Sequence, residues 1–325
     1  MSKRRWFASS VVLIAAAAYG IRAYMLRATL PQHILDSNDL FKGKTTLITG
    51  ATDGIGLATS IQLHKMGSNL IIGARNPEKA REKIKLIRSS RNDNVEPTIH
   101  FIPLDLSSLE STREFAAQVK DLDVKIDYIV NNAGAYFSTF GLTNDGYEQS
   151  WQINHLSHFL LTTILLGRLN KNARIINLSS DAHFRANNYQ PLTLEQVRDD
   201  MSNSTYKSFF GTYGLSKMCN ILFSTELQKR VPDDVTVVSV HPGYVQTPMA
   251  RDAFSIVGPL VYAFESWLAK TPLQGAYTTI YAMTSNEIEK GGYYSDCAKA
   301  TPSPASQNDE FAKKLWELSE QCIKQ

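Results

Sequence analysis

The sequence predicts an α/β protein whose single domain is built on a doubly wound parallel sheet of about seven strands. An apolar, β-branched run at 45–48 leads into a glycine-rich turn at 49–56, and a helical pattern follows through residue 66. This strand–turn–helix order is the unit from which parallel sheets are built. Farther along, strand-like runs alternate with helical patterns, without an internal repeat or a break into a second domain.

Composition and charge narrow the class of protein. The 325 residues are 43% hydrophobic, which is enough for a full core and argues against disorder. Residues 1–35 carry five of the 34 basic residues and no acid, so 29 bases face 31 acids in the remainder. This near-neutral body offers no basic face for nucleic acid. The scattered cysteines, Cys219, Cys297 and Cys322, form neither a disulfide framework nor a metal motif and indicate a reducing compartment.

The amino terminus has the composition of a membrane anchor. Residues 6–21 form an uncharged run of 16 residues with basic residues on both sides, slightly short of the roughly 20 that a spanning helix needs. Arg22 could extend the run by reaching to the membrane interface. We expect an anchor at 1–28, a connector at 29–42 and the α/β domain at 43–325. A mitochondrial targeting segment is the alternative, and a cleaved secretory signal is the least favoured.

The glycine-rich turn is suited to hold the phosphates of a dinucleotide. Gly50 permits the tight turn, Gly54 lets the backbone approach a phosphate, and Gly56 lets the helix pack closely on the strand. A pyrophosphate would lie on the free N–H groups at the positive end of the helix. Three more residues of the turn are expected to contact the cofactor: Thr52, Asp53 and Ile55. The Asp53 carboxylate should point away, because an acid facing phosphates is unfavourable.

The second strand, at 69–73, ends beside Arg75. A cofactor with a free ribose 2′-OH requires an acid about 20 residues after the glycines, whereas a 2′-phosphate favours an arginine. Arg75 lies 21 residues after Gly54, and the next acid is Glu78. The sequence therefore predicts NADP(H). The alternative interpretation is a solvated arginine at the start of a helix.

The rest of the chain supplies the remaining elements of such a fold. Strands are expected at 99–103, 126–130, 174–180, 235–240 and 291–297. Helices are expected at 77–91, 146–162, 213–230 and 311–323. Polar or turn-forming residues follow four of the strands, where the carboxyl ends of parallel strands meet at one edge: Asp105 and Leu106; Asn131, Asn132, Ala133 and Gly134; Ser179 and Ser180; Pro242 and Gly243.

Taken together, these motifs resemble the short-chain dehydrogenase/reductase family. Its pattern of T-G-x-x-x-G-I-G, N-N-A-G, an asparagine helix, S-S, Y-x-x-x-K and P-G occurs here in the family's order over roughly residues 43–300. The asparagine–histidine stretch within 146–162 and the segments at 292–297 and 315–319 are similar to the retinol-dehydrogenase-like branch. The resemblance implies a Rossmann fold and an oxidoreductase that uses a nicotinamide cofactor.

Tyr213 and Lys217 are the expected proton-transfer pair. They are four residues apart on a predicted helix, so their side chains share one face. A free phenol has a pKa near 10, and a nearby ammonium together with oxidised nicotinamide would lower it. Ser180, matching the family's second serine, would hold the substrate carbonyl, with Ser179 as the alternative. Asn154 matches the family's helix asparagine and would hold a water that relays protons towards Lys217.

The resemblance also assigns the remaining cofactor contacts. Asp105, followed by Leu106, would bind the adenine side, although Asp105 is equally suited to the turn before a helix capped at Ser107 or Ser108. Asn132, Ala133 and Gly134 would line the adenosine side, although ordinary turn chemistry explains them as well. Four residues would lie against the nicotinamide: Pro242, Gly243, Val245 and Thr247. His155 and His158 are three apart on a helix, but no third metal ligand is visible nearby, so packing is expected.

The substrate is expected to be lipophilic. Apolar residues repeat at helical spacing between 257 and 268, which would form the substrate-side lid or, alternatively, ordinary packing or a homodimer face. The resulting prediction is an NADP(H)-dependent enzyme that interconverts a retinol-like alcohol and its aldehyde or ketone. It would be anchored in the endoplasmic reticulum or, alternatively, in a mitochondrial membrane. A steroid or lipid-keto reductase and a non-catalytic nucleotide-binding scaffold are the competing functions.

Overall fold

One sheet of eight strands runs through the protein in the order β3-β2-β1-β4-β5-β6-β7-β8. The computed structural model describes residues 20–91, 97–186, 193, 211–247 and 267–324. The strands have these bounds: β1 (Thr45–Thr49), β2 (Asn69–Ala74), β3 (Ile99–Pro103), β4 (Ile126–Asn131), β5 (Leu169–Leu178), β6 (Thr236–His241), β7 (Tyr293–Ser295) and β8 (Ala298–Lys299). The predicted α/β fold is confirmed, but the sheet has one strand more than expected. The two residues of β8, antiparallel to β7, are too few to give a sequence pattern.

The strand order reverses between β1 and β4. β1 pairs in parallel with β2 on one side and with β4 on the other, so the chain winds outward in both directions from this pair. In open α/β sheets the carboxyl ends of such a pair border a crevice in which ligands bind. The glycine turn that follows Thr49 and the turn that follows Asn131 therefore lie side by side.

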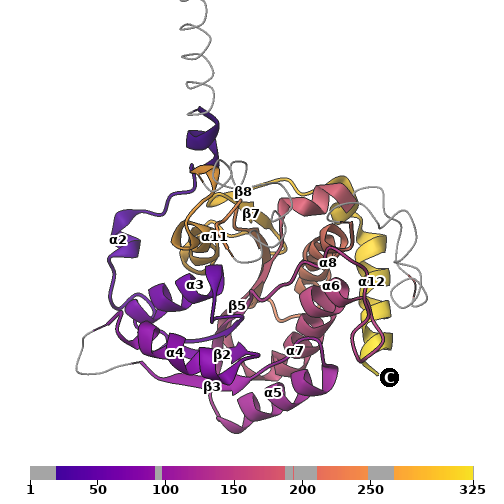
Figure 1. The fold of residues 1–325 in the computed structure, drawn as a ribbon, viewed down its shortest axis with the longest axis horizontal. Helices are drawn as coiled ribbons and strands as arrows, with labels where there is room; N and C mark the ends of the chain where they lie inside the picture. Colours follow the sequence, from indigo (N-terminus) through magenta and orange to yellow (C-terminus); the bar gives the residue numbers. More distant parts are fainter. Residues whose placement is uncertain (1–19, 92–96, 187–192, 194–210, 248–266, 325) are drawn as a thin grey trace, which may run out of the picture.

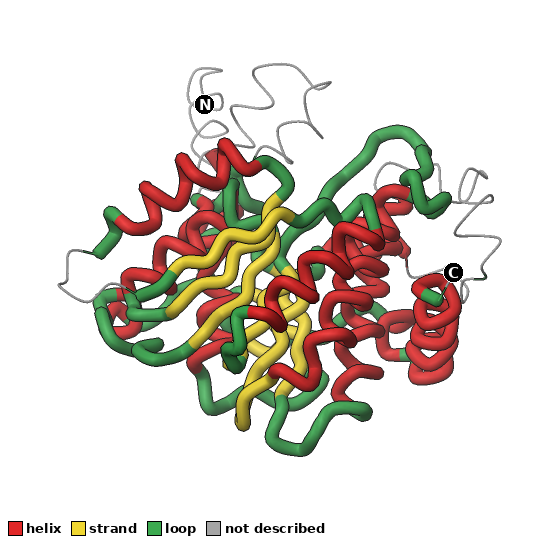
Figure 2. Tube along the Cα trace, turned by 90° about the horizontal axis from the view of Figure 1, so that it is seen from below, coloured by secondary structure: helices red, strands yellow, loops and turns green. Residues whose placement is uncertain are grey.

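Helices cover both faces of the sheet, as Figures 1 and 2 show. One layer contains α3 (Gly54–Lys65), α4 (Pro77–Arg88) and α11 (Pro272–Thr284). The other contains α5 (Leu109–Asp121), α7 (Ser157–Leu165) and α8 (Gly211–Gln228), with α12 (Asp309–Ile323) outside it. Neighbouring residues of each strand face opposite layers, so Ile48 packs into one core and Leu47 into the other. This burial on both faces explains why β1 and β2 are apolar without alternation.

The helix expected at 146–162 is interrupted. It consists of α6 (Gln149–Trp151), a π-helical turn at Gln152–Leu156 and then α7. Hydrophobic periodicity cannot reveal one wider turn here, because nearly every residue from 151 to 162 is buried and the segment has no exposed face. π-Turns inside helices occur frequently at functional sites, and this one contains Asn154. The remaining short helices are α2 (Gln32–Leu35), Leu166–Arg168, Asp181–Ala186 and Pro304–Gln307.

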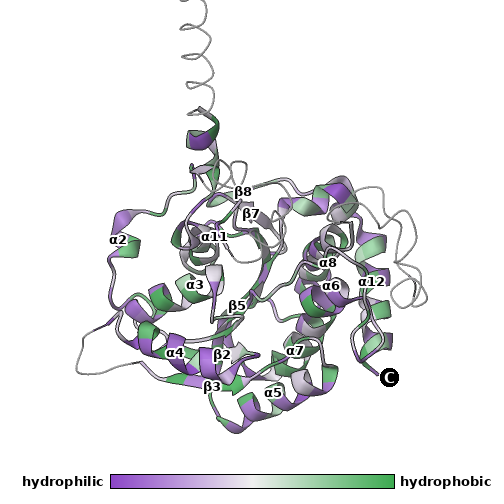
Figure 3. Ribbon diagram, viewed as in Figure 1, coloured by the Kyte–Doolittle hydropathy of each residue, from purple (hydrophilic) through white to green (hydrophobic). Residues whose placement is uncertain are grey.

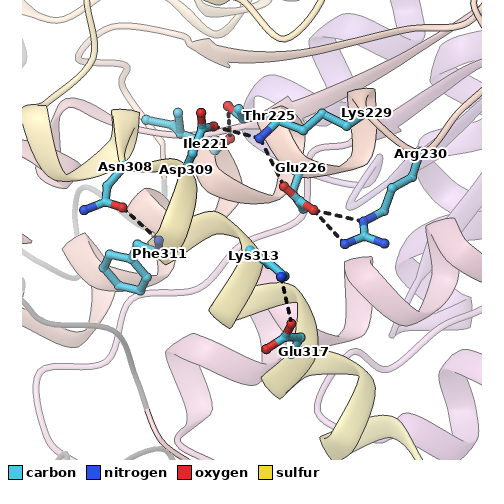
Figure 4. A network of polar contacts seen from close by, with 10 residues as sticks. All are labelled: Ile221, Thr225, Glu226, Lys229, Arg230, Asn308, Asp309, Phe311, Lys313 and Glu317. Atoms are coloured by element: carbon cyan, nitrogen blue, oxygen red, sulfur yellow. Dashed lines mark hydrogen bonds and ion pairs between the residues drawn. The ribbon is translucent and has the colours of Figure 1, made fainter.

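The closing helix α12 packs against α8. Its apolar residues Phe311, Leu315 and Leu318 are buried, and hydrophobic and hydrophilic residues alternate along it in Figure 3. Figure 4 shows the polar contacts at its start, where Lys229 of the chain after α8 lies 2.7 Å from the carboxylate of Asp309. These contacts fix the far end of α8, which is the helix expected to carry the proton-transfer pair.

Most of the expected anchor lies outside the described residues. Residues 20–25 are helical, and within the described ranges no helix combines the length and the apolar character of a membrane span. The connector is less exposed than a polar linker would be, since Leu30 and Phe41 are buried in the core. The apolar repeat expected as a lid also lies outside the described residues, except for its last two positions.

Candidate active site

A cleft of about 580 Å³ opens at the carboxyl ends of β1 and β4, within the usual size range of ligand pockets. Most of the predicted cofactor residues line it: Gly50, Thr52, Asp53, Gly54, Ile55, Gly56, Arg75, Asp105, Leu106, Asn132, Ala133, Gly134, Tyr213, Lys217, Pro242 and Thr247. Gly243 and Val245 lie behind this wall. Val245 is buried, and a Cβ on Gly275 would lie 2.7 Å from its side chain.

The glycine turn is packed so closely that side chains cannot be added. Gly50 has a φ of +69°, and a Cβ there would lie 2.9 Å from the Cα of Ala133. A Cβ on Gly56 would overlap the carbonyl oxygen of Gly50 and the side-chain nitrogen of Asn132. That nitrogen donates to the carbonyl oxygen of Thr49 at 2.7 Å. Asn132 therefore joins the turns after β1 and β4, and the glycines expose their backbone to the cleft.

Asp53 both caps α3 and faces a cation. Its carboxylate accepts a hydrogen bond of 2.8 Å from the Gly54 N–H and pairs with the Lys79 ammonium. Burial would raise the pKa of this carboxyl, but the hydrogen bonds from Lys79 and Gly54 hold the pKa below its ordinary value. The ionised carboxylate is thus engaged by the protein although Asp53 lines the cleft. Arg75, at the end of β2, is exposed in the same wall.

Asp105 combines the two roles that the sequence left open. Its carboxylate accepts hydrogen bonds from the N–H and hydroxyl of Ser107, at 2.9 and 2.7 Å, which makes it the turn residue before α5. Ser108 caps that helix by accepting from the Ser111 N–H at 3.1 Å. Asp105 and Leu106 also line the cleft. The hydrogen bonds with Ser107 therefore hold the Asp105 carboxylate in one position at the cleft.

Tyr213 and Lys217 reach the cleft from the same face of α8. The Lys217 ammonium lies 5.6 Å from the centre of the Tyr213 ring and donates to the Leu178 carbonyl oxygen at 3.2 Å. Burial lowers the pKa of Lys217 to about 8. Burial also raises the pKa of Tyr213 to about 12, against a lowering contribution from a hydrogen bond with Ser180.

The expected lowering of the phenol pKa therefore does not come from the protein's own groups. The cost of burying a phenolate outweighs the hydrogen bond between Tyr213 and Ser180, and the negative charge of Asp181 raises the pKa of Tyr213 further. Tyr213 is held protonated, which suits a proton donor. A positive charge placed beside the phenol, as in an oxidised nicotinamide, would have the sign needed to lower the pKa.

Ser179 and Ser180 have different surroundings. Ser180, which hydrogen-bonds Tyr213, donates to Asp181 at 3.1 Å and accepts from the Ala182 N–H at 3.2 Å. Ser179 is buried and donates at 2.7 Å to the Lys217 carbonyl oxygen, which ties β5 to α8, although it also contributes to the cleft wall. The contact with the Tyr213 hydroxyl favours Ser180 as the partner of a substrate oxygen.

Asn154 has a structural role in the π-turn. Its side chain accepts from the Ala135 N–H at 2.7 Å and donates to the Ala135 carbonyl and to the Ser216 hydroxyl, each at 2.9 Å. It thereby links the segment after Gly134 to α8. These contacts engage both ends of its amide. The role of water holder stays a prediction.

The two histidines of this helix point to different partners. His158 pairs with the Thr49 hydroxyl and His155 with the Ser319 hydroxyl, each at 2.9 Å. Burial lowers the pKa of His155 to about 3 and that of His158 to about 4, so both rings are neutral. Within the described part of the chain, no group of three potential ligands is placed to bind a metal ion.

The structure gives roles to two residues to which the sequence assigned none, Thr49 of the glycine motif and Tyr136. The Thr49 hydroxyl accepts hydrogen bonds from the N–H groups of Asn132 and Ala133, at 3.0 and 2.9 Å, and so aligns the two turns. In the sequence, the feature that indicates this role of Thr49 is a hydroxyl residue directly before the first glycine of the turn. Tyr136 lies in the cleft wall with its ring edge-on to Tyr213, 5.8 Å between centres. Its position just after the N-N-A-G segment was the available signal.

Known proteins resemble this chain along most of its length. The family model for short chain dehydrogenase matches residues 44–192. Retinol dehydrogenase 14 of Mus musculus is 36% identical, with 87% of each chain covered. Retinol dehydrogenase 13 of Homo sapiens is 33% identical and covers 97% of this chain and 93% of its own. A crystal structure of an uncharacterized protein from Mycobacterium Paratuberculosis is 27% identical with a TM-score of 0.67, over 90% of this chain and 97% of that one.

Proposed function

Because the chain belongs to the short-chain dehydrogenase/reductase family and resembles its retinol dehydrogenases, we propose that it interconverts a lipophilic alcohol and its aldehyde or ketone with NADP(H). One observation carries the proposal: Tyr213 and Lys217 stand together on one helix in the wall of the glycine-turn cleft, with Ser180 at the phenol. Tyr213 is the proposed general acid/base.

The cleft fits a nicotinamide dinucleotide. The glycine turn leaves no room for side chains, and a cofactor pyrophosphate would meet bare backbone at the positive end of α3. Arg75 would hold the 2′-phosphate, and Lys217 and the segment from Pro242 to Thr247 would hold the nicotinamide end. The bound cofactor supplies the hydride that the protein itself lacks.

The protein's residues then handle the oxygen of the substrate. In the reaction the Ser180 hydroxyl, which otherwise donates to Asp181, would turn its one proton to the carbonyl oxygen and stabilise the negative charge that develops there. Tyr213, protonated at neutral pH because burial raises its pKa to about 12, gives its proton to the same oxygen. The buried Lys217 ammonium provides a fixed positive charge near the phenolate that remains. Asn154 keeps α8 and the segment after Gly134 in register.

A carbonyl panel with NADPH tests the function. Retinal, fatty aldehydes and steroid ketones are each offered to the full-length protein, and cofactor oxidation and product are measured. We expect reduction of retinal or another lipophilic aldehyde. Turnover of steroid or lipid ketones alone would select the alternative reductase. NADPH binding without turnover of any carbonyl would select the nucleotide-binding scaffold.

Cofactor preference should depend on Arg75. Replacing it in Arg75→Asp should weaken NADPH binding by about 10- to 100-fold, because a charge-assisted hydrogen bond to the 2′-phosphate is lost and a repulsive charge is added. NADH affinity should change by less than about threefold, since it lacks that phosphate. Arg81→Asp, the same change at an exposed arginine on the following helix α4, is the matched control. Equal losses for both cofactors would show that Arg75 is only a surface residue.

We also propose that residues 1–28 anchor the protein in a membrane, the endoplasmic reticulum being favoured and a mitochondrial membrane the alternative. The uncharged run and its basic flanks support this. Full-length protein should stay in the membrane pellet after a high-salt, alkaline wash. A variant that lacks residues 1–19 keeps every described contact of the N-terminal segment and should move to the supernatant. Full-length protein in the supernatant would contradict the anchor.

A further inference from the structure

A buried lysine lies behind the segment that would face the nicotinamide. Lys270 is only 1% exposed, and its side chain passes directly under Gly243. Gly243 has a φ of +86°, and a Cβ there would overlap the Lys270 ammonium and lie 2.8 Å from its Cε. We call residues 242–247 the nicotinamide segment. The Lys270 side chain and the backbone of this segment are packed so closely that neither can shift without the other.

Lys270 holds the nicotinamide segment through both its backbone and its side chain. Its N–H donates to the Tyr244 carbonyl at 2.8 Å, and its carbonyl accepts from the Gln246 N–H at 2.9 Å. Its ammonium donates to the Pro242 carbonyl at 3.3 Å and forms an ion pair with Asp296. One residue thus fastens three peptide units of the segment, those that follow Pro242 and Tyr244 and the one that precedes Gln246.

The nicotinamide segment in turn forms one wall of the cleft. Pro242 and Thr247 line it, and a Cβ on Gly54 would lie 3.1 Å from the Thr247 side chain. The segment therefore leans against the glycine turn. A shift of Lys270 would move this wall while leaving the adenine side, built by Asp105 and Leu106, in place.

Asp296 connects Lys270 to the amino-terminal part of the chain. Its second carboxylate oxygen lies 2.8 Å from the Arg27 guanidinium, so two cations share one carboxylate. Burial would raise the pKa of Asp296, but the contact with Lys270 and the charge of Arg27 hold the pKa below its ordinary value. Arg27 is followed by Ala28 and Leu30, which are buried. The part of the chain that follows residue 19 is thus tied to the body of the protein by the ion pairs Arg27–Asp296 and Lys270–Asp296.

We propose that Lys270 is a positioning residue for the nicotinamide half of the cofactor and that the chain Arg27–Asp296–Lys270 couples the docking of the amino-terminal segment to that position. The inference rests on the proposed function, because it assigns the nicotinamide to this wall. Lys270 acts through the segment that it holds and touches neither substrate nor cofactor. The charge on a buried lysine requires its carboxylate partner, so the pair acts as a unit.

The test compares two ligands on the full-length protein. NADPH spans the whole cleft, whereas adenosine 2′,5′-bisphosphate fills only the adenine half. Lys270→Met keeps most of the side-chain volume and removes the charge. We expect NADPH to bind about tenfold more weakly and carbonyl reduction to fall by about 10- to 100-fold, because misplacement of reacting groups is costly. The affinity for adenosine 2′,5′-bisphosphate should change by less than about twofold.

Three further variants make the outcome decisive. The double variant Lys270→Met/Asp296→Asn removes both charges, so it should fold even where the single variant does not, and it should show the same selective loss of NADPH affinity. Arg27→Gln should give a smaller loss of about two- to fivefold, since an exposed ion pair contributes little. Lys299→Met is the control. It removes a lysine on β8, close in sequence to Asp296, and breaks the exposed ion pair of that lysine with Glu289.

Normal NADPH affinity and turnover in both Lys270 variants would overturn the proposal. Equal losses for NADPH and for the adenine fragment would also overturn it, because they indicate general destabilisation. Wild-type protein that binds NADPH but reduces no carbonyl would defeat the proposed function alone, since the comparison of ligands is still made. Wild-type protein that fails to bind NADPH would defeat both.

Discussion

We expect Tyr213→Phe to lower the rate of carbonyl reduction by about two to four orders of magnitude while NADPH affinity stays within about twofold of wild type. The range is the usual one for loss of a general acid. The substitution removes one oxygen and keeps the ring, so packing against Tyr136 is preserved. The phenol is protonated at neutral pH because burial raises its pKa to about 12, and phenylalanine has no proton to give.

NADPH fluorescence titration and single-turnover reduction of an active aldehyde measure the two quantities separately. Tyr128→Phe, the same change in a core tyrosine that packs edge-on against Phe41, is the control and should leave both unchanged. A Tyr213→Phe protein that binds NADPH normally and reduces at nearly the wild-type rate would end the proposed mechanism.

The ionisation of Tyr213 gives a second check on the same residue. An ordinary tyrosine is half ionised near pH 10. In a difference titration of wild type against Tyr213→Phe without cofactor, Tyr213 should contribute almost no phenolate at pH 10. Saturating NADP⁺ should make the phenolate appear at lower pH, because a positive charge favours the ionised form. An identical titration with and without NADP⁺ would contradict the placement of the nicotinamide beside the phenol.

The second large effect is expected for Lys217→Met. Turnover should fall by about 100-fold or more, and NADPH should bind about tenfold more weakly, because one buried ammonium is proposed to act both on the phenol and on the nicotinamide end of the cofactor. Burial lowers the pKa of Lys217 to about 8. Wild-type affinity for NADPH should therefore decline as the pH rises above about 8, since the neutral amine attracts the anionic cofactor less. Lys217→Met should lack this decline.

Lys229→Met is the matched control for that experiment. Lys229 follows the same helix at its far end, where it pairs with Asp309 away from the cleft (Figure 4). Its loss should leave turnover and NADPH affinity unchanged. A Lys217→Met protein with a lower melting temperature but unaltered affinity and pH profile would show that the lysine is only a packing residue.

The sequence by itself determined the fold class and the order of its motifs. Strand and helix periods, the glycines at 50, 54 and 56, and the four-residue spacing of Tyr213 and Lys217 are local features, so they can be recognised from neighbouring residues alone. The cleft then follows from topology, because parallel strands place the ends of β1 and β4 at one edge. Those patterns therefore predicted many of the residues that line the cleft.

Only the tertiary structure decided how these residues are held and charged. The raised pKa of Tyr213 comes from burial, which arises only when α8 packs against other parts of the fold, such as Tyr136 and Ser180. The π-turn at Gln152–Leu156 lies in a segment that is buried on nearly all sides, so no hydrophobic period marks it. Lys270 and Asp296 are 26 residues apart, and Arg27 is 269 residues from Asp296. Contacts over such separations leave no periodic trace in the sequence, because folding alone brings their partners together.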